Sequence, residues 1–305
     1  MMNYKYYIAD VFTDRIFQGA QIAVFPKAEG LNKDTMQRIA KEMNLSETVF
    51  VFDEEGANHF RLRTFSPKQE LEFGGHPMIA AAWVLTSNGD LQLSGEHTPL
   101  VFEQNTGPIN VYVTTEDGQP KLVQFTMPVS ATVDRFVPTD KELAAILSLD
   151  TAELENKKFD PMLISCGKNY LIIPVNIYQT VRKARFNFNA WSGSSAPSTL
   201  AREILLVTPT SGAGMSDFHA RMVGPDISQA EDPPIGTALP AFTAYLCQHK
   251  HISKGTYVFS IDRGMESTRR SELNIEMDNK PDNELVIRVG GPAILVAEGQ
   301  INLAD

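Results

Sequence analysis

The sequence predicts an α+β fold of two related domains, each with a mixed β-sheet and few helices. Two stretches share the same order of features: Arg63–Pro67 with a later Gly-Gly-His-Pro, and Arg221–Pro225 with a later Ile-Gly-Thr-Ala. In both, a strand-like segment ends at a proline, and a glycine precedes an apolar helical run. The chain has 305 residues, whereas one hydrophobic core organises about 250 to 300 residues. We therefore expect two domains, 1–122 and 123–305.

The elements of the first domain follow from local patterns. Asn32 is a suitable N-cap for a helix whose apolar residues recur every three to four positions, and Asn44 can end that helix in the left-handed conformation. Pro77 suits a helix start, and Gly89 ends the same helical run. The expected strands are Tyr6–Phe12, Ile22–Phe25, a strand from Glu47, and Phe60–Phe65.

The second domain repeats this order of elements. Its main helix is expected from about Ala238 to Gln248, with Pro240 in the first turn, where its missing N–H is harmless. Its expected strands are Leu122–Met127, Tyr170–Val175, Ile204–Thr208, His219–Val223, Tyr257–Ile261, Leu285–Val289 and Ile294–Val296.

Composition narrows the functional class. A formal net charge of -10 and the lack of a basic stripe argue against nucleic-acid or anionic-membrane partners. The sequence lacks the roughly 20 consecutive apolar residues of a membrane-spanning helix. Cys166 and Cys247 have neither disulfide-like nor metal-like spacing. These features predict a soluble cytoplasmic protein.

Glu47 is the first candidate for chemistry. It opens a strand of Val and Phe residues and shares its side of that strand with Val49 and Val51, which we expect to be buried. Partial burial raises the pKa of a carboxyl group toward neutrality and makes the group useful in proton transfer. The alternative is an exposed glutamate at a strand start.

Two further candidates lie near helix starts, where unpartnered N–H groups can bind a carboxylate or phosphate. A neutral His76 could hydrogen-bond a ligand there, or could cap the helix. Asp232 precedes the second helix start, where capping is the alternative reading. His249 and His251 have no evident third partner, so we expect no metal site.

With these residues in hand, the chain resembles the phenazine-biosynthesis PhzF-like family, whose architecture is shared with diaminopimelate epimerase. The resemblance covers nearly the whole chain, and its specificity comes from the combination of a Glu-in-strand, a Gly-His-Pro and a Glu-Asp-Pro motif that includes Glu231. The matching segments are Asp10–Thr13, Asn44–Thr48, Arg63–Pro67, Gly74–Pro77, Arg221–Thr237 and Val289–Gly299.

The resemblance implies two pseudo-symmetric domains, each a mixed sheet rolled around a central helix, with the active site between them. It implies a cofactor-independent isomerase that moves a proton between carbons of a small carboxylate, and it suggests a homodimer. Glu47 would be the acid/base that transfers the proton. The substrate-binding residues would be Gly74, Gly75, His76, Asp232, Gly236 and Thr237.

The sequence departs from the family pattern at two places. Gly19–Gln21 replaces the usual Gly-Asn-Pro, and Asp232–Thr237 reads Asp-Pro-Pro-Ile-Gly-Thr, so Ile235 replaces a pocket hydroxyl. The substrate therefore stays open, as do two alternatives: a binding or regulatory protein without turnover, and an epimerase with a single acid/base. The two cysteines of the epimerase relatives are absent here.

Overall fold

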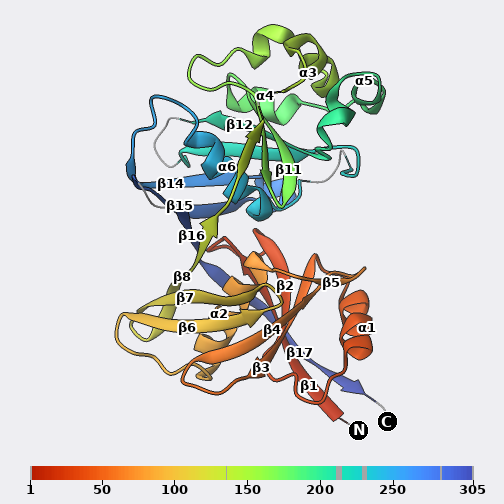
Figure 1. Cartoon of the computed structure of the whole chain (residues 1–305). Helices are drawn as coiled ribbons and strands as arrows, with labels where there is room; N and C mark the ends of the chain where they lie inside the picture. Colours follow the sequence, from red (N-terminus) through yellow and green to blue (C-terminus); the bar gives the residue numbers. More distant parts are fainter. Residues whose placement is uncertain (1, 135, 211–214, 229–231, 282–283, 304–305) are drawn as a thin grey trace. The chain divides into compact units, whose positions relative to one another are not determined.

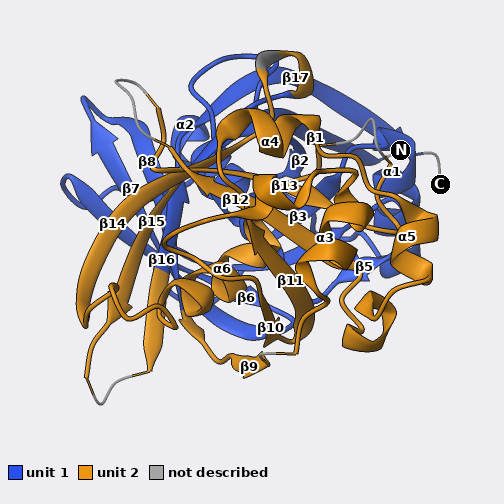
Figure 2. Ribbon diagram, turned by 90° about the horizontal axis from the view of Figure 1, so that it is seen from above, with its two compact units in different colours: residues 1–127, 269–273, 288–305 blue, residues 128–268, 274–287 orange. Residues whose placement is uncertain are grey.

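The computed structural model describes residues 2–134, 136–210, 215–228, 232–281 and 284–303 (Figure 1). The chain divides into two compact units (Figure 2). Unit 1 comprises residues 1–127, 269–273 and 288–305, and unit 2 comprises residues 128–268 and 274–287. These bounds differ from the expected 1–122 and 123–305, because β8 (Gln119–Val129) runs through residue 122 and the C-terminal segments return to unit 1.

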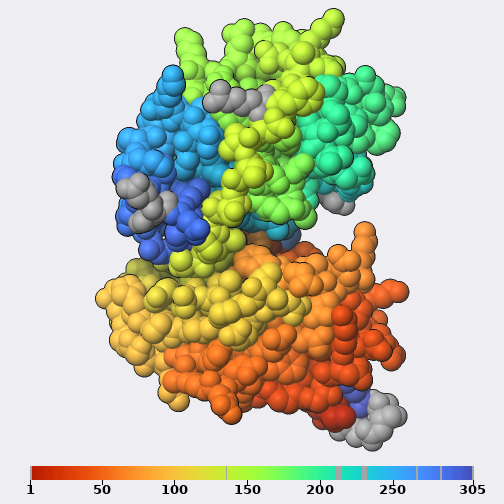
Figure 3. Space-filling view, viewed as in Figure 1, coloured from red at the N-terminus to blue at the C-terminus, as the bar shows by residue number. Residues whose placement is uncertain are grey.

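In its described residues, unit 1 is a mixed sheet with two helices. β1 pairs antiparallel with β17 and β2, β2 parallel with β3, β3 antiparallel with β4, β4 parallel with β6, and β6–β8 are antiparallel neighbours. The outward side chains of β6 and β7 form part of the surface in Figure 3, in yellow. Besides β8, the elements of unit 1 are β1 (Met2–Val11), β2 (Ala20–Phe25), α1 (Lys33–Met43), β3 (Glu47–Asp53), β4 (His59–Phe65), β5 (Glu70–Leu71), α2 (Gly75–Asn88), β6 (His97–Gln104), β7 (Gly107–Glu116) and β17 (Ala293–Leu303).

Unit 2 repeats this order of pairings. β10 pairs antiparallel with β11, β11 parallel with β12, β12 antiparallel with β13, and β13 parallel with β14. Strands β15 and β16 carry residues of both units. The remaining elements are β9 (Thr132–Asp134), α3 (Asp140–Leu147), η1 (Thr151–Leu154), β10 (Met162–Cys166), β11 (Lys168–Pro174), α4 (Tyr178–Lys183), α5 (Phe188–Ser192), η2 (Ala196–Thr199), β12 (Glu203–Pro209), β13 (Phe218–Val223), η3 (Gly236–Ala238), α6 (Leu239–Leu246), β14 (Gly255–Arg263), η4 (Glu266–Thr268), β15 (Ser271–Asn279) and β16 (Leu285–Gly291).

Each unit buries one apolar helix. Helix α2 is buried along almost its whole length and packs against β1, β2, β3 and β17, as its nearly unbroken apolar sequence requires. Helix α6 is buried in the same way and contacts β10 and β11. By contrast, α1 is amphipathic, and only Met36, Ile39 and Ala40 are buried. The predicted caps are present: Asn32 accepts from the Thr35 backbone N–H, and Asn44 is left-handed.

Both faces of β3 are buried, one against α1 and the other against α2. Phe50 belongs to the apolar cluster that includes Met36 and Ile39 of α1. Because side chains alternate along a strand, Glu47 and Val49 point to the opposite face, which packs against α2.

Two helix starts differ from expectation. Helix α2 begins at Gly75, which makes Pro77 its third residue rather than its first. In unit 2 a 3-10 turn, η3, precedes α6, so Gly236 and Thr237 lie in this turn and the α-helix begins at Leu239. Proline at the second position of α6 fits this later start, because its missing N–H is not needed there.

Candidate active site

Glu47 is the first residue of β3 and is partly buried. Its neighbours on the same side of the strand, Val49 and Val51, are fully buried. Burial alone raises the pKa of Glu47 from 4.5 to about 7. The carboxyl group therefore exchanges its proton readily at neutral pH, which is the property that a general acid/base needs.

Helix α2 packs against β3 on the face of the sheet toward which Glu47 points. Gly74 is the N-cap, with extended backbone and no side-chain cap, and the first turn contains no acidic residue. A Cβ on Gly74 would lie 2.9 Å from both the Pro77 Cγ and the Thr64 Oγ1 atoms. Only glycine fits at this position without a shift of the neighbouring side chains. Gly75 is similarly confined, since its Cβ would lie 3.1 Å from the Phe125 ring.

His76 is buried in the first turn of α2. The Phe12 ring meets the His76 ring edge-on, with centroids 5.0 Å apart and planes at 89°. Phe12 itself has a left-handed backbone, φ 63°. Its N–H donates to Pro292 O at 2.8 Å and its carbonyl accepts from Glu272 N at 2.9 Å. The two C-terminal segments of unit 1 thus bond the backbone of the residue whose ring contacts His76.

In unit 2, the Asp232 carboxylate is almost fully buried. Its Oδ2 atom accepts from Arg182 Nη1 at 2.7 Å, and Arg263 donates to its backbone carbonyl. The N-cap residues of η3 and α6 are Ile235 and Ala238, so Asp232 is held by an ion pair and caps neither helix. Its Oδ1 atom is buried and accepts no hydrogen bond from the residues that the structure describes. Glu231, its neighbour in the Glu-Asp-Pro motif, lies outside them.

Gly236 and Thr237 lie in η3, where Thr237 is exposed and Gly236 is partly exposed. Burial raises the pKa of the Tyr170 hydroxyl, and the neighbouring Thr237 side chain opposes this shift. Glu203 begins β12 and pairs with Tyr170 of β11, as Glu47 begins β3 and pairs with Ile22 of β2. The repeat thus places a glutamate at the same strand position in both units.

Sequence reasoning missed the side chains that support these groups. Arg182 is 50 residues from Asp232 along the chain, and Gln104, which bonds Gly74, is 30 residues away. Glu203 could have been found by aligning the two halves of the chain from Glu47.

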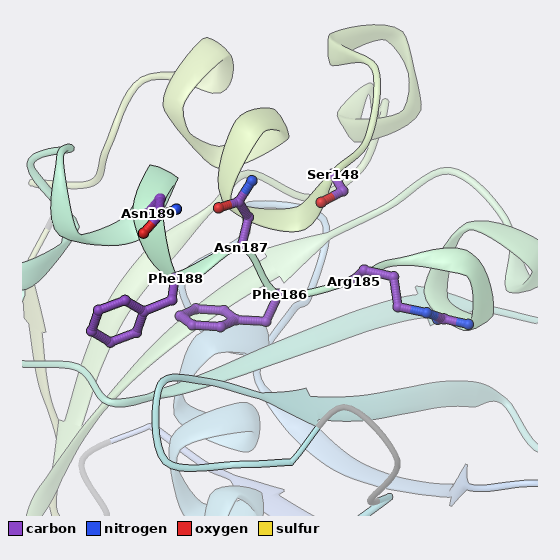
Figure 4. A pocket seen from close by; sticks show the side chains of 6 residues that line it. All are labelled: Ser148, Arg185, Phe186, Asn187, Phe188 and Asn189. Carbon is purple, nitrogen blue, oxygen red and sulfur yellow. The ribbon is translucent and has the colours of Figure 1, made fainter.

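Other features of the described residues lie apart from these groups. A shallow cavity of about 300 Å³ in unit 2 is lined by none of the expected site residues (Figure 4). The described residues contain no group of three or more His, Cys, Asp or Glu side chains that could hold a metal ion. Within the same ranges, no helix is long and apolar enough to cross a membrane. The residues that line the cavity are Ser148, Arg185, Phe186, Asn187, Phe188 and Asn189.

Comparison with known proteins decides the family. Residues 9–299 match the family described as phenazine biosynthesis-like protein. The chain belongs to this family. It is 49% identical to an uncharacterized isomerase of Pasteurella multocida over 98% of this chain and 94% of the relative. It is 27% identical to the trans-2,3-dihydro-3-hydroxyanthranilate isomerase of Pseudomonas aeruginosa, over 98% of this chain and 100% of the relative.

Solved structures agree with the fold. The Bacillus anthracis phenazine biosynthesis protein of the PhzF family superposes with a TM-score of 0.84 at 21% identity, covering 99% of this chain and 100% of the other. A probable proline racemase of Agrobacterium radiobacter superposes with a TM-score of 0.59 at 12% identity, covering 99% and 93%. The expected two-domain, epimerase-like α+β fold is confirmed, and so is the expectation of an isomerase. The roles of the individual residues stay predictions.

Proposed function

We propose that this protein moves a proton between carbons of a small carboxylate substrate, with Glu47 as the acid/base. The observation that carries the proposal is the partly buried Glu47 carboxyl group, whose pKa burial raises to about 7. A group with such a pKa is present in both protonation states at neutral pH. It can therefore take a proton from one carbon and return it to another.

The start of α2 supplies the proposed electrostatic partner. Removing a proton next to a carboxylate, or from a carbon conjugated with one, leaves negative charge that spreads into the carboxylate oxygens. The N-terminal end of α2 has no acidic residue in its first turn and carries a partial positive charge. The Gly75 backbone N–H group and the buried His76 would bind the carboxylate and stabilise that charge. Gly74 would shape this site as the N-cap, since Gln104 already bonds its N–H and carbonyl groups.

In unit 2 we assign Asp232, Gly236 and Thr237 to substrate binding. Support for Asp232 comes from its arrangement: one carboxylate oxygen is fixed by Arg182, and the other is buried without a hydrogen-bond partner in the described ranges. An ionised carboxylate only accepts hydrogen bonds. The substrate would therefore offer Asp232 an N–H or O–H group.

The remaining parts of the proposal concern cofactors, assembly and location. We propose that the reaction needs no metal or organic cofactor, since Glu47 and the helix start supply a base and charge stabilisation by themselves. We further propose a cytoplasmic homodimer, following the resemblance and the reduced cysteines, Cys166 and Cys247.

The test measures the exchange of carbon-bound hydrogen atoms of the substrate for deuterium from the solvent. The protein is incubated in deuterated water with a panel of small carboxylates that includes trans-2,3-dihydro-3-hydroxyanthranilate, the compound that names the Pseudomonas relatives. NMR spectroscopy then locates deuterium in the product. We expect deuterium on a carbon other than the one that lost its proton. Deuterium at the original carbon with inverted configuration would indicate an epimerase, and tight binding without exchange would indicate a binding protein.

A further inference from the structure

A buried glutamine holds the residue that begins helix α2. Gln104, the last residue of β6, is 5% exposed. Its Oε1 atom accepts from Gly74 N at 2.8 Å, and its Nε2 atom donates to Gly74 O at 3.4 Å. One side chain therefore bonds both polar groups of a single residue, which fixes the direction of the Gly74 backbone.

The chemistry of this contact is unusual for a helix start. Helix N-caps are most often Ser, Thr, Asp or Asn, whose side chains bond the first N–H groups of their own helix. Here the N-cap is Gly74 without a side-chain cap, and the first turn contains no acidic residue. The Gln104 amide is neutral, so it satisfies the N-cap without cancelling the partial positive charge of the helix end.

A second buried polar side chain lies against the same residue. Thr64 is 3% exposed, and its Oγ1 atom has no hydrogen-bond partner among the residues that the structure describes. This oxygen would lie 2.9 Å from a Cβ on Gly74, and the Thr64 Cγ2 atom 3.1 Å from it, so the end of the Thr64 side chain lies against the helix start. A buried hydroxyl group without a partner is costly unless something else bonds it. Thr64 therefore indicates that a polar ligand group belongs next to Gly74.

From these contacts we infer that Gln104 is a positioning residue that makes the start of α2 selective for a carboxylate over a neutral group. It holds the Gly74 backbone in place and, being uncharged, leaves the positive helix end available to the ligand. This inference rests on the proposed function, because it takes the substrate to be a small carboxylate. It adds a residue that selects the ligand without touching it.

The test compares one charged and one neutral probe by isothermal titration calorimetry. The probes are anthranilate, which carries a carboxylate group, and anthranilamide, which carries a neutral amide group in the same place. Gln104→Glu keeps the size of the side chain and the acceptor for Gly74 N–H, loses only the longer 3.4 Å bond to Gly74 O, and adds a negative charge. At mildly alkaline pH we expect anthranilate to bind at least about tenfold more weakly, because two negative charges a few ångströms apart repel strongly in a protein. Anthranilamide affinity should change less than about twofold, because a neutral probe feels little of that repulsion.

Two other variants complete the design. Gln37→Glu is the matched control, since Gln37 lies on α1 of the same unit and bonds Ser66 O at 2.9 Å. It should change neither affinity. Gln104→Met removes both bonds to Gly74 without adding charge, so we expect it to weaken both probes. It also decides the question if Gln104→Glu does not fold, because unchanged affinities in Gln104→Met would overturn the inference.

Three results with folded variants would contradict the inference. They are equal effects of Gln104→Glu on the two probes, equal effects of Gln104→Glu and Gln37→Glu on anthranilate, and a wild-type protein that does not prefer anthranilate. Proton exchange is measured separately. If Glu47→Gln loses exchange but Gln104→Glu binds anthranilate as the wild type does, only the inference about Gln104 is refuted. If Glu47→Gln still exchanges protons but Gln104→Glu binds anthranilate more weakly, only proton transfer by Glu47 is refuted.

Discussion

Replacing Glu47 with glutamine should make the protein more stable at alkaline pH, even though it removes the proposed acid/base. Burial raises the pKa of this carboxyl group from 4.5 to about 7 in the folded protein. Each tenfold change in an ionisation constant corresponds to about 1.4 kcal/mol, so full ionisation of Glu47 would cost the folded state about 3 kcal/mol. Because Glu47 keeps some exposure to solvent, we expect about 1 to 3 kcal/mol.

The direction of the pH effect follows from proton binding. Below pH 4.5 the carboxyl group is protonated in both the folded and the unfolded chain, so ionisation of Glu47 costs nothing. As the pH rises, the unfolded chain loses this proton first, and the free energy of unfolding falls until the pH passes about 7. Glu47→Gln has no proton to lose, so its advantage over the wild type should be absent at about pH 4 and full at about pH 8.5.

Urea unfolding followed by circular dichroism at these two pH values measures the difference. Glu42→Gln is the control, since Glu42 is exposed on α1 and its replacement should change the free energy of unfolding equally little at both. A Glu47→Gln variant that is no more stable than the wild type at alkaline pH would refute the argument from burial, and with it the main physical support for the acid/base role.

Three further predictions concern the surroundings of the site. Gly74→Ala should lower the free energy of unfolding by about 1 to 3 kcal/mol, because the added methyl group would lie 2.9 Å from the Thr64 hydroxyl oxygen. An unchanged melting temperature would show that this helix start has more room than the structure gives it. Arg182→Met should cost up to about 3 to 5 kcal/mol, because it removes the ion-pair partner of the buried Asp232 carboxylate and leaves its Oδ2 atom the longer 3.4 Å bond from Thr268 Oγ1. A silent change in urea unfolding would argue against this ion pair. Extensive dialysis against a chelator should leave activity and melting temperature unchanged, whereas a stoichiometric metal whose removal abolishes activity would contradict a cofactor-independent reaction.

Local sequence patterns predicted the local parts of the fold. Asn32 and Asn44 end helix α1 as expected, and Gly89 ends α2 with a left-handed φ of 75°. Strand β3 begins at Glu47, the residue expected to open it. These features depend on a few neighbouring residues, since a cap or a left-handed turn is decided by the residue type at one position. Helix α3, with a complete capping box from Thr139 to Glu142, had the same kind of signal and was missed.

Such local patterns do not predict which strands pair when they lie far apart in the sequence. The pairing of β1 with β17 brings Tyr6 opposite Gly299, and no local periodicity indicates that partner. The same holds for the site. Alternation along one strand indicated a partly buried carboxylate at Glu47, with an exposed glutamate as the alternative, and the structure shows partial burial. The ion pair of Arg182 with Asp232 and the bonds from Gln104 to Gly74 depend on folding segments far apart in the chain.

The most direct test of the account is the rate of substrate proton exchange in Glu47→Gln. Glutamine keeps the shape of glutamate but cannot take up and release a proton, and general acid/base catalysis contributes about 10² to 10⁴ in rate. With a substrate identified by deuterium incorporation, we expect the variant to fold, to bind that substrate with near wild-type affinity, and to lose turnover and solvent exchange by at least that factor. A variant that still exchanges substrate protons at the wild-type rate would contradict the central role of Glu47 and would assign the reaction to another group, with Asp232 the first to examine.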